Sequence, residues 1–196
     1  MNAGRTPTAS PRGLRQGARS PRSGEFLVRA GAPCLGSAPR VADVILLRHA
    51  YAGHKADWDR DDALRPLTAR GLAQAESLVR SLADDDITVV WTSAAVRCRQ
   101  TVEPLAAARG LVVQDHALLA KDVPVDDLLD WILSNPSAPW ALCTHGEVLR
   151  ELIIVARSSG LVTAPARATE KGAAWRVRRH EDGATALEYV PPLLLR

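Results

Sequence analysis

After residue 41, short apolar runs rich in β-branched residues alternate with longer segments whose apolar residues recur at helical spacing. This alternation constrains the fold more than any other feature of the chain. Strands separated by helices in this way form a mainly parallel sheet with helices on both faces. The sequence therefore predicts an α/β protein, a three-layer α/β/α sandwich around one central sheet.

The spacing of apolar residues also predicts the individual elements. Residues 41–47 form an apolar run broken only by Asp43, which is typical of a strand buried on both faces. Thr68 is a candidate N-cap for a first helix in which apolar residues recur from Leu72 to Leu82. The further expected strands are 87–91, 111–114, 140–144, 173–177 and 185–190, and the further helices are 94–109, 125–133 and 147–156. The last two strands are expected to pair, as a hairpin around Asp182-Gly183.

The first 40 residues differ from the rest in composition. They contain seven Arg and one Glu, six of the 13 Gly and five of the 13 Pro. Such a segment buries too little apolar surface to offset the entropy cost of ordering. We therefore expect residues 1–40 to be a disordered basic tail and residues 41–196 to be one domain. A solvated extension, an over-long assignment of the start site and an arm that docks on acidic partners all agree with this composition.

Charge and cysteine content narrow the class of protein. The net charge of +3 comes from the tail, because residues 41–196 carry 18 basic and 21 acidic side chains. The charge of the domain thus gives no indication of nucleic-acid binding. No apolar run approaches the ~18 residues of a membrane span, and Cys34, Cys98 and Cys143 match neither a disulfide framework nor a CxxC metal site. We expect a cytoplasmic protein with no nucleic-acid and no membrane partner.

Three of the expected strands end in unusual polar residues. The strands are followed by Arg48-His49, by Thr92-Ser93 and by Thr144-His145-Gly146. In open α/β sheets, ligands bind outside the carboxyl ends of the strands. We therefore expect the two histidines to meet in one crevice, where nearby helix N-termini direct their N–H groups towards an anion.

His49 is the candidate nucleophile of this crevice. A neutral imidazole attacks well near pH 7, and a covalent phosphoryl-histidine splits one difficult displacement into two easier ones. Arg48 and Arg97 each supply a planar fork that matches phosphate oxygens, and His145 donates to the same oxygens if it is protonated. These four side chains predict a phosphoryl site that requires no metal.

Four stretches of the chain resemble known motifs in their known order. They are Leu47-Arg48-His49-Ala50; Arg65-Pro66-Leu67-Thr68 with Arg70-Gly71 and Gln74-Ala75; the run from Thr92 to Thr101; and Thr144-His145-Gly146-Glu147-Val148. Together they resemble the histidine phosphatase (phosphoglycerate-mutase-like) superfamily over residues 44 to about 178. The short length is similar to the SixA-type branch. The run RHAYAGHKADWDRDDALRPLT is similar to the phosphatase domain found behind Nudix hydrolases in actinobacteria.

This resemblance implies a histidine-phosphatase-like fold and a metal-independent phosphohydrolase without a cofactor. It implies that His49 is phosphorylated, that Arg48, Arg97 and His145 bind phosphate, and that the basic side chains Lys55, Arg65 and Lys171 contact the substrate at the mouth of the site. On residue type alone, a solvated surface charge is an equally good interpretation of those last three.

The proton donor departs from the family pattern. The larger family commonly uses a Glu after the third strand, but residues 116–122 read HALLAKD. Asp122 is the candidate general acid, although an acid at a helix start before Pro124 is an equally good interpretation. A missing Glu favours a leaving group that needs little acid assistance, such as a phosphohistidine nitrogen or a pyrophosphate oxygen, over simple alkyl phosphates.

The segment from His54 to Arg65 is expected to be a loop at the rim of the site that selects the substrate. Its aspartates at 57, 59, 61 and 62 disfavour highly anionic substrates unless Arg60 and Arg65 screen them. The expected substrate is a phosphohistidine protein, a phosphorylated small molecule or a nucleotide phosphate, and a separate Nudix hydrolase is a conceivable partner.

Two other functions stay open at this point. One is a phosphate-binding or partner-binding module of the same fold without catalysis. The other is a metal hydrolase that uses His49, His54 and His145, although their spacing lacks the i, i+4 placement on one helix face that is typical of such sites.

Overall fold

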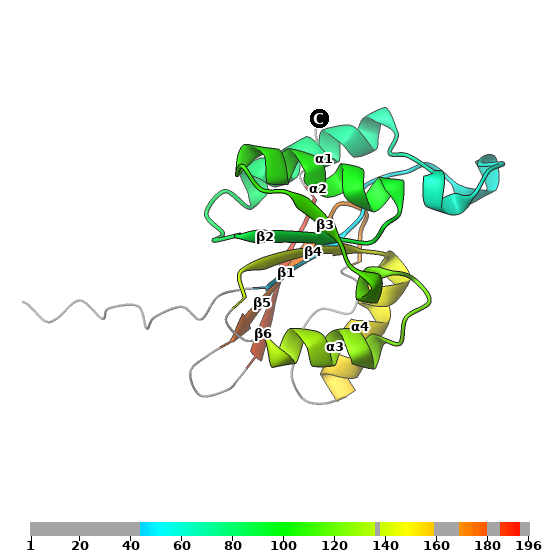
Figure 1. The fold of residues 1–196 in the computed structure, drawn as a ribbon. Helices are drawn as coiled ribbons and strands as arrows, with labels where there is room; N and C mark the ends of the chain where they lie inside the picture. The colour runs from blue at the N-terminus through cyan, green and yellow to red at the C-terminus, as the bar shows by residue number, and fades with distance from the viewer. Residues whose placement is uncertain (1–43, 136–137, 159–168, 180–184, 193–196) are drawn as a thin grey trace, which may run out of the picture. The chain divides into compact units, whose positions relative to one another are not determined.

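The structure, a computed structural model, describes residues 44–135, 138–158, 169–179 and 185–192. These residues form one six-stranded sheet with two helices on each face (Figure 1). The predicted tail at residues 1–40 and the predicted turn at Asp182-Gly183 lie outside the described residues.

The sheet has the strand order β3-β2-β4-β1-β5-β6. The strands are β1 (Val44–Arg48), β2 (Val89–Thr92), β3 (Val113–Asp115), β4 (Trp140–Thr144), β5 (Ala174–Arg179) and β6 (Thr185–Val190). The first four pair in parallel, whereas β5 runs antiparallel to β1 and β6 antiparallel to β5. The prediction of a mainly parallel sheet with a closing pair of strands is confirmed.

The helices cover the two faces in pairs. α1 (Ala69–Ser81) and α2 (Val96–Ala108) lie on one face, and α3 (Val125–Ser134) and α4 (Gly146–Ser158) lie on the other (Figure 1). Strand β1 contributes side chains to the apolar cores on both faces of the sheet, because side chains alternate along a strand. Ile45 and Leu47 pack with α1 and α2, whereas Val44 and Leu46 pack with α3 and α4. No helix in the described parts of the chain is both long and apolar enough to cross a membrane.

Local signals fix the helix ends. The Thr68 hydroxyl accepts a hydrogen bond from the Gly71 N–H at 3.3 Å, which makes Thr68 the N-cap of α1, as predicted. Gly110, at φ +66°, follows the end of α2, where only glycine adopts this backbone conformation easily.

The rim segment differs in part from the predicted loop. It contains two 3₁₀ turns, η1 (Lys55–Asp57) and η2 (Asp62–Leu64), and a third, η3 (Ala117–Leu119), follows β3. The Asp61 carboxylate caps η2 by accepting from the Ala63 N–H at 2.9 Å. Asx caps of this kind stabilise short turns without any apolar periodicity, so the apolar pattern gave no sign of η2.

Candidate active site

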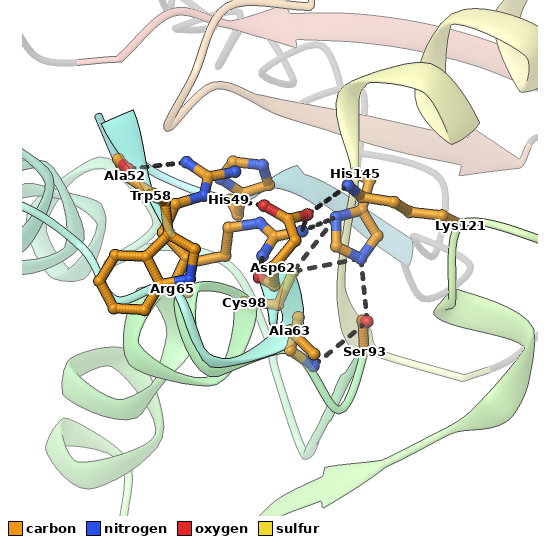
Figure 2. Close-up of polar contacts among 12 residues, drawn as sticks. His49, Ala52, Trp58, Asp62, Ala63, Arg65, Ser93, Cys98, Lys121 and His145 are labelled. Atoms are coloured by element: carbon orange, nitrogen blue, oxygen red, sulfur yellow. Dashed lines mark hydrogen bonds and ion pairs between the residues drawn. The ribbon is translucent and has the colours of Figure 1, made fainter. Parts of the chain in front are cut away.

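The register of the parallel strands brings the two histidines together. Arg48 of β1 lies beside Thr144 of β4, and the main-chain N–H of His49 donates to the Thr144 carbonyl at 3.0 Å. The rings of His49 and His145 therefore meet edge to face, with centroids 5.6 Å apart. Ser93, after β2, joins them because its hydroxyl lies 2.9 Å from Nε2 of His145 (Figure 2). All three strand ends that stood out in the sequence contribute to one site.

His49 is held as a neutral imidazole. Its side chain is buried, and burial, reinforced by the charges of Arg97, His145 and Arg48, lowers its pKa to about 3. Its Nδ1 lies 2.8 Å from the Ala50 carbonyl, which can only accept, so this hydrogen bond assigns the proton to Nδ1. The lone pair of Nε2 is then available for attack on an electrophile.

His145 is oriented by groups on two sides. Nη2 of Arg97 lies 3.4 Å from Nδ1 of His145, and the Ser93 hydroxyl lies 2.9 Å from Nε2. The sulfur of Cys98 packs against the same ring, 3.7 Å from Nε2. These contacts on both sides fix the ring plane of His145.

Arg48 and Arg97 carry buried donors without a partner among the described residues. Nη1 of Arg48 donates to the Thr169 carbonyl and Nη1 of Arg97 to the Asp62 carbonyl, but Nε of each is buried and unpaired. Leaving a buried donor unsatisfied costs about 1–3 kcal/mol, so such donors indicate a missing acceptor. Two unpaired guanidinium N–H groups beside a neutral histidine are suited to an oxyanion.

Gly146 makes room for one of these guanidinium groups. A Cβ built on Gly146 would collide with Nε, Cζ and Nη2 of Arg48. Because Gly146 begins α4, the Arg48 side chain lies across the N-terminus of that helix. Any larger residue at position 146 would push Arg48 out of its place.

The three predicted contacts at the mouth have different surroundings. Arg65 is buried and donates through Nη1 to the Ala52 carbonyl at 2.7 Å. Lys171 donates to the Gly53 carbonyl at 3.3 Å and lies over the Tyr51 ring. Burial, together with nearby arginines that include Arg48 and Arg97, lowers the pKa of Lys171, so it belongs to the same cationic cluster. Lys55 is exposed in η1, and no hydrogen bond or ion pair joins its side chain to the described residues of the site.

Asp62 and Lys121 are central to the site, but the sequence interpretation assigned neither a role of its own. The Asp62 carboxylate lies 2.8 Å from Nε of Arg65, 3.1 Å from Nη2 of Arg97 and 2.9 Å from Nζ of Lys121 (Figure 2). Asp57, Asp59 and Asp61 are exposed, so Asp62 is not one more member of an acidic patch. The i, i+3 spacing of Asp62 and Arg65 was visible in the sequence, whereas the contacts across 35 and 59 residues were not.

A cavity of about 490 Å³ adjoins this cluster. Arg97, His145, Asp62 and Lys121 line one part of it, and Asp115, His116 and Asp122 line another. The predicted proton donor Asp122 is exposed at the cavity, beside Lys121. The cavity reaches the histidine pair through His145, which lines it, whereas His49 and Arg48 are not among its lining residues.

Polar residues of the motif stretches hold the loops around His49. Thr101 of α2 accepts from the Ala50 N–H at 2.9 Å. Gln74 of α1 accepts from the Tyr51 N–H at 2.9 Å and donates to the Lys171 carbonyl at 3.1 Å. Gln100 accepts from the Leu67 N–H at 2.8 Å. Both helices of one face therefore fix the backbone that carries the nucleophile.

In the described residues, no group of three His, Cys, Asp or Glu is arranged to hold a metal ion. His54, one of three histidines in the metal-hydrolase alternative, is exposed and lies 3.4 Å from the Tyr51 hydroxyl. It is therefore not part of the group formed by His49 and His145.

Two comparisons of the sequence agree on a family. Residues 44–120 match the model of the histidine phosphatase superfamily (branch 1). The chain is also 31% identical over 156 residues to an 8-oxo-(d)GTP phosphatase of Mycolicibacterium smegmatis, a match that covers 76% of this chain and 48% of the relative. The chain thus spans about half the length of the curated relative it matches.

Solved structures agree on the fold. The protein histidine phosphatase SixA, complexed with tungstate, superposes with a TM-score of 0.61 at 19% identity, over 76% of this chain and 97% of that one. A mycobacterial glucosyl-3-phosphoglycerate phosphatase superposes with a TM-score of 0.53 at 15% identity, over 76% and 97% of the two chains. The family match over residues 44–120, the relative and the shared fold all agree with the histidine phosphatase superfamily.

Proposed function

We propose that the protein is a metal-independent phosphohydrolase that acts through a phosphohistidine on His49. The observation that carries this proposal is the state of His49: a buried, neutral imidazole whose Nδ1 is tied to the Ala50 carbonyl, leaving Nε2 free. A strand-end histidine kept neutral only for packing would not need unpaired guanidinium donors from Arg48 and Arg97 around it.

The proposed reaction has two displacements at phosphorus. Nε2 of His49 forms a bond to phosphorus while the bond to the leaving group breaks, and Arg48, Arg97 and His145 stabilise the charge on the phosphoryl oxygens. The leaving group takes a proton, for which Asp122 remains the predicted donor. Water then attacks the phosphohistidine, inorganic phosphate leaves, and neutral His49 is regenerated.

The proposed substrate class is based on the relatives and not on the geometry of the site. The relatives named above are, by their descriptions, a protein histidine phosphatase, a glucosyl-3-phosphoglycerate phosphatase and an 8-oxo-(d)GTP phosphatase. We propose a phosphohistidine protein or a small or nucleotide phosphate as the substrate. A Nudix hydrolase partner is a proposal of the same kind, based on the resemblance of the rim sequence described above.

The decisive experiment is to trap the phosphoenzyme by intact-mass measurement. The wild-type chain is mixed with phosphohistidine, nucleotide and sugar-phosphate substrates and quenched rapidly. We expect an adduct of about 80 Da on the wild type and none on His49→Ala, because only an imidazole at this position can attack. Turnover of a substrate with no adduct on the wild type would contradict the covalent mechanism.

Hydrolysis of an aryl phosphate with and without EDTA separates the alternatives. The proposal expects turnover in both conditions. Loss of turnover in EDTA would favour the metal hydrolase. Binding of phosphate without turnover of any substrate would favour the non-catalytic module.

A further inference from the structure

The site holds a carboxylate in the middle of its cations. Asp62 accepts hydrogen bonds from Arg65 through Oδ1 and from Arg97 and Lys121 through Oδ2 (Figure 2). Burial opposes ionisation of this group, but the hydrogen bonds from Lys121 and Arg65 and the charge of Arg97 outweigh it and hold the pKa of Asp62 well below its usual range. The carboxylate is therefore charged at any pH at which the protein works.

The backbone holds Asp62 in this position. Its own carbonyl accepts from Nη1 of Arg97, and Asp61 before it caps the turn through the Ala63 N–H. Nε1 of Trp58 donates a further hydrogen bond to the Asp61 carbonyl at 2.9 Å. Because the main chain is anchored as well as the side chain, the carboxylate stays in place when an anion enters beside it.

Asp62 divides the positive charge of the site into two parts. Arg65, Lys121 and Nη2 of Arg97 are occupied by its carboxylate. The buried Nε groups of Arg48 and Arg97 have no partner among the described residues. The free donors therefore suffice for one phosphoryl group, and the donors that would hold a second phosphate are already neutralised.

The cavity beside Asp62 is lined by further carboxylates. Asp115 and Asp122 line it together with Asp62, Lys121 and Arg97, so three carboxylates, one ammonium group and one guanidinium group surround this space, and Asp115 is paired with Arg99. A second or third phosphate in that space would meet negative charge within a partly desolvated region, where Coulomb repulsion is stronger than in water.

We propose that Asp62 is a specificity-determining residue that restricts the site to a single phosphoryl group on a leaving group that is neutral or cationic where it enters the cavity. This inference rests on the proposed function for its biological meaning, because only an enzyme discriminates between substrates. A monophosphate ester or a phosphohistidine meets the requirement. The β- and γ-phosphates of a di- or triphosphate do not, because the phosphate left behind would lie against Asp62.

The test is a comparison of orthophosphate and pyrophosphate binding by titration calorimetry. The quantity of interest is the ratio of the two dissociation constants in each protein, which cancels general losses of affinity. In Asp62→Asn we expect the dissociation constant of pyrophosphate relative to that of orthophosphate to fall about tenfold, since one half-buried negative charge is removed. In Lys121→Met, where Asp62 loses a neutralising partner, we expect the dissociation constant of pyrophosphate relative to that of orthophosphate to rise.

Asp59→Asn is the matched control, because Asp59 is an exposed aspartate of the same segment. It should leave the ratio within roughly twofold of wild type, as expected for a solvated charge. If Asp62→Asn weakens the binding of both anions equally, Asp62 only positions the arginines and the inference is wrong. A shift in Asp59→Asn as large as in Asp62→Asn would also overturn it, since any charge on the segment would then suffice.

These results are independent of catalysis. Absence of a phosphoenzyme on the wild type refutes the proposed function, whereas an unchanged binding ratio refutes the role of Asp62. If Asp62→Asn does not fold, the Lys121→Met shift decides the question, because it alters the same charge balance without touching Asp62.

Discussion

Asp122 differs from Asp62 and Glu147, two other carboxylates beside the site, in ways that affect proton transfer. Asp62 is ion-paired to three cations. Burial of Glu147 raises its pKa, but its own main-chain N–H and the charge of Lys121 outweigh burial and lower the pKa of Glu147. A general acid must carry a proton at the working pH, which disfavours both of these groups. Asp115, which also lines the cavity, is paired with Arg99 at 2.6 Å, and Asp122, exposed at the cavity, stays the predicted donor.

We predict that Asp122→Asn slows hydrolysis of alkyl phosphates by about tenfold or more, because an alkoxide leaves poorly without a proton. Aryl phosphates and phosphohistidine, whose leaving groups are less basic or already protonated, should be much less affected. The measurement is kcat/KM for matched alkyl and aryl esters. Unchanged alkyl turnover would remove Asp122 from the mechanism.

At the scale of elements, the start of α4 determines where Arg48 lies. The helix begins at Gly146, directly after His145, and its first residue has no Cβ where the Arg48 guanidinium crosses. The same junction therefore sets two predicted phosphate ligands.

We predict that Gly146→Ala lowers kcat/KM by about tenfold or more, as expected for losing a charge-assisted contact to phosphate. The midpoint of thermal unfolding should change little, because the colliding atoms are the end of one side chain. A double-variant cycle with Arg48→Ala is the control. Gly146→Ala should add almost no further loss in that background, and a full additional loss would mean that it acts through something other than Arg48.

For the molecule as a whole, the site makes stability depend on pH. The pKa of His49 is about 3 in the folded protein, below the ~6.5 of an unfolded histidine. Between these two values the unfolded chain binds a proton that the folded chain does not, so acidification favours unfolding. The contribution of His49 is complete above pH ~6.5 and is lost as the pH falls towards the folded value.

We predict that the free energy of unfolding falls by about 1.4 kcal/mol per pH unit below pH ~6.5 on account of His49 alone. Urea unfolding of wild type and His49→Asn at several pH values isolates this contribution, because the other titrating groups are common to both. The wild type should lose more stability on acidification. Parallel pH dependences would show that His49 is not kept neutral by the fold.

The sequence predicted the architecture well because apolar runs alone define the layers. The strands at 140–144 and 185–190 have the predicted bounds, and Thr68 caps its helix as expected. The meeting of His49 and His145 also followed from strand ends in a parallel sheet. The role of Asp62 could not be predicted in the same way. Four aspartates lie within six residues, and only contacts to Arg97 and Lys121, far along the chain, distinguish one of them.

The place of β1 in the sheet has a consequence for biosynthesis. Among the described strands β1 is translated first, yet its two neighbours, β4 and β5, are translated fourth and fifth. The segment that carries Arg48 and His49 therefore leaves the ribosome long before either of its pairing partners exists. Contacts this distant in sequence form late in folding. A nascent chain that stops before Ala174 has already made every predicted catalytic and phosphate-binding residue but still lacks one of the two strands that hold its nucleophile in place.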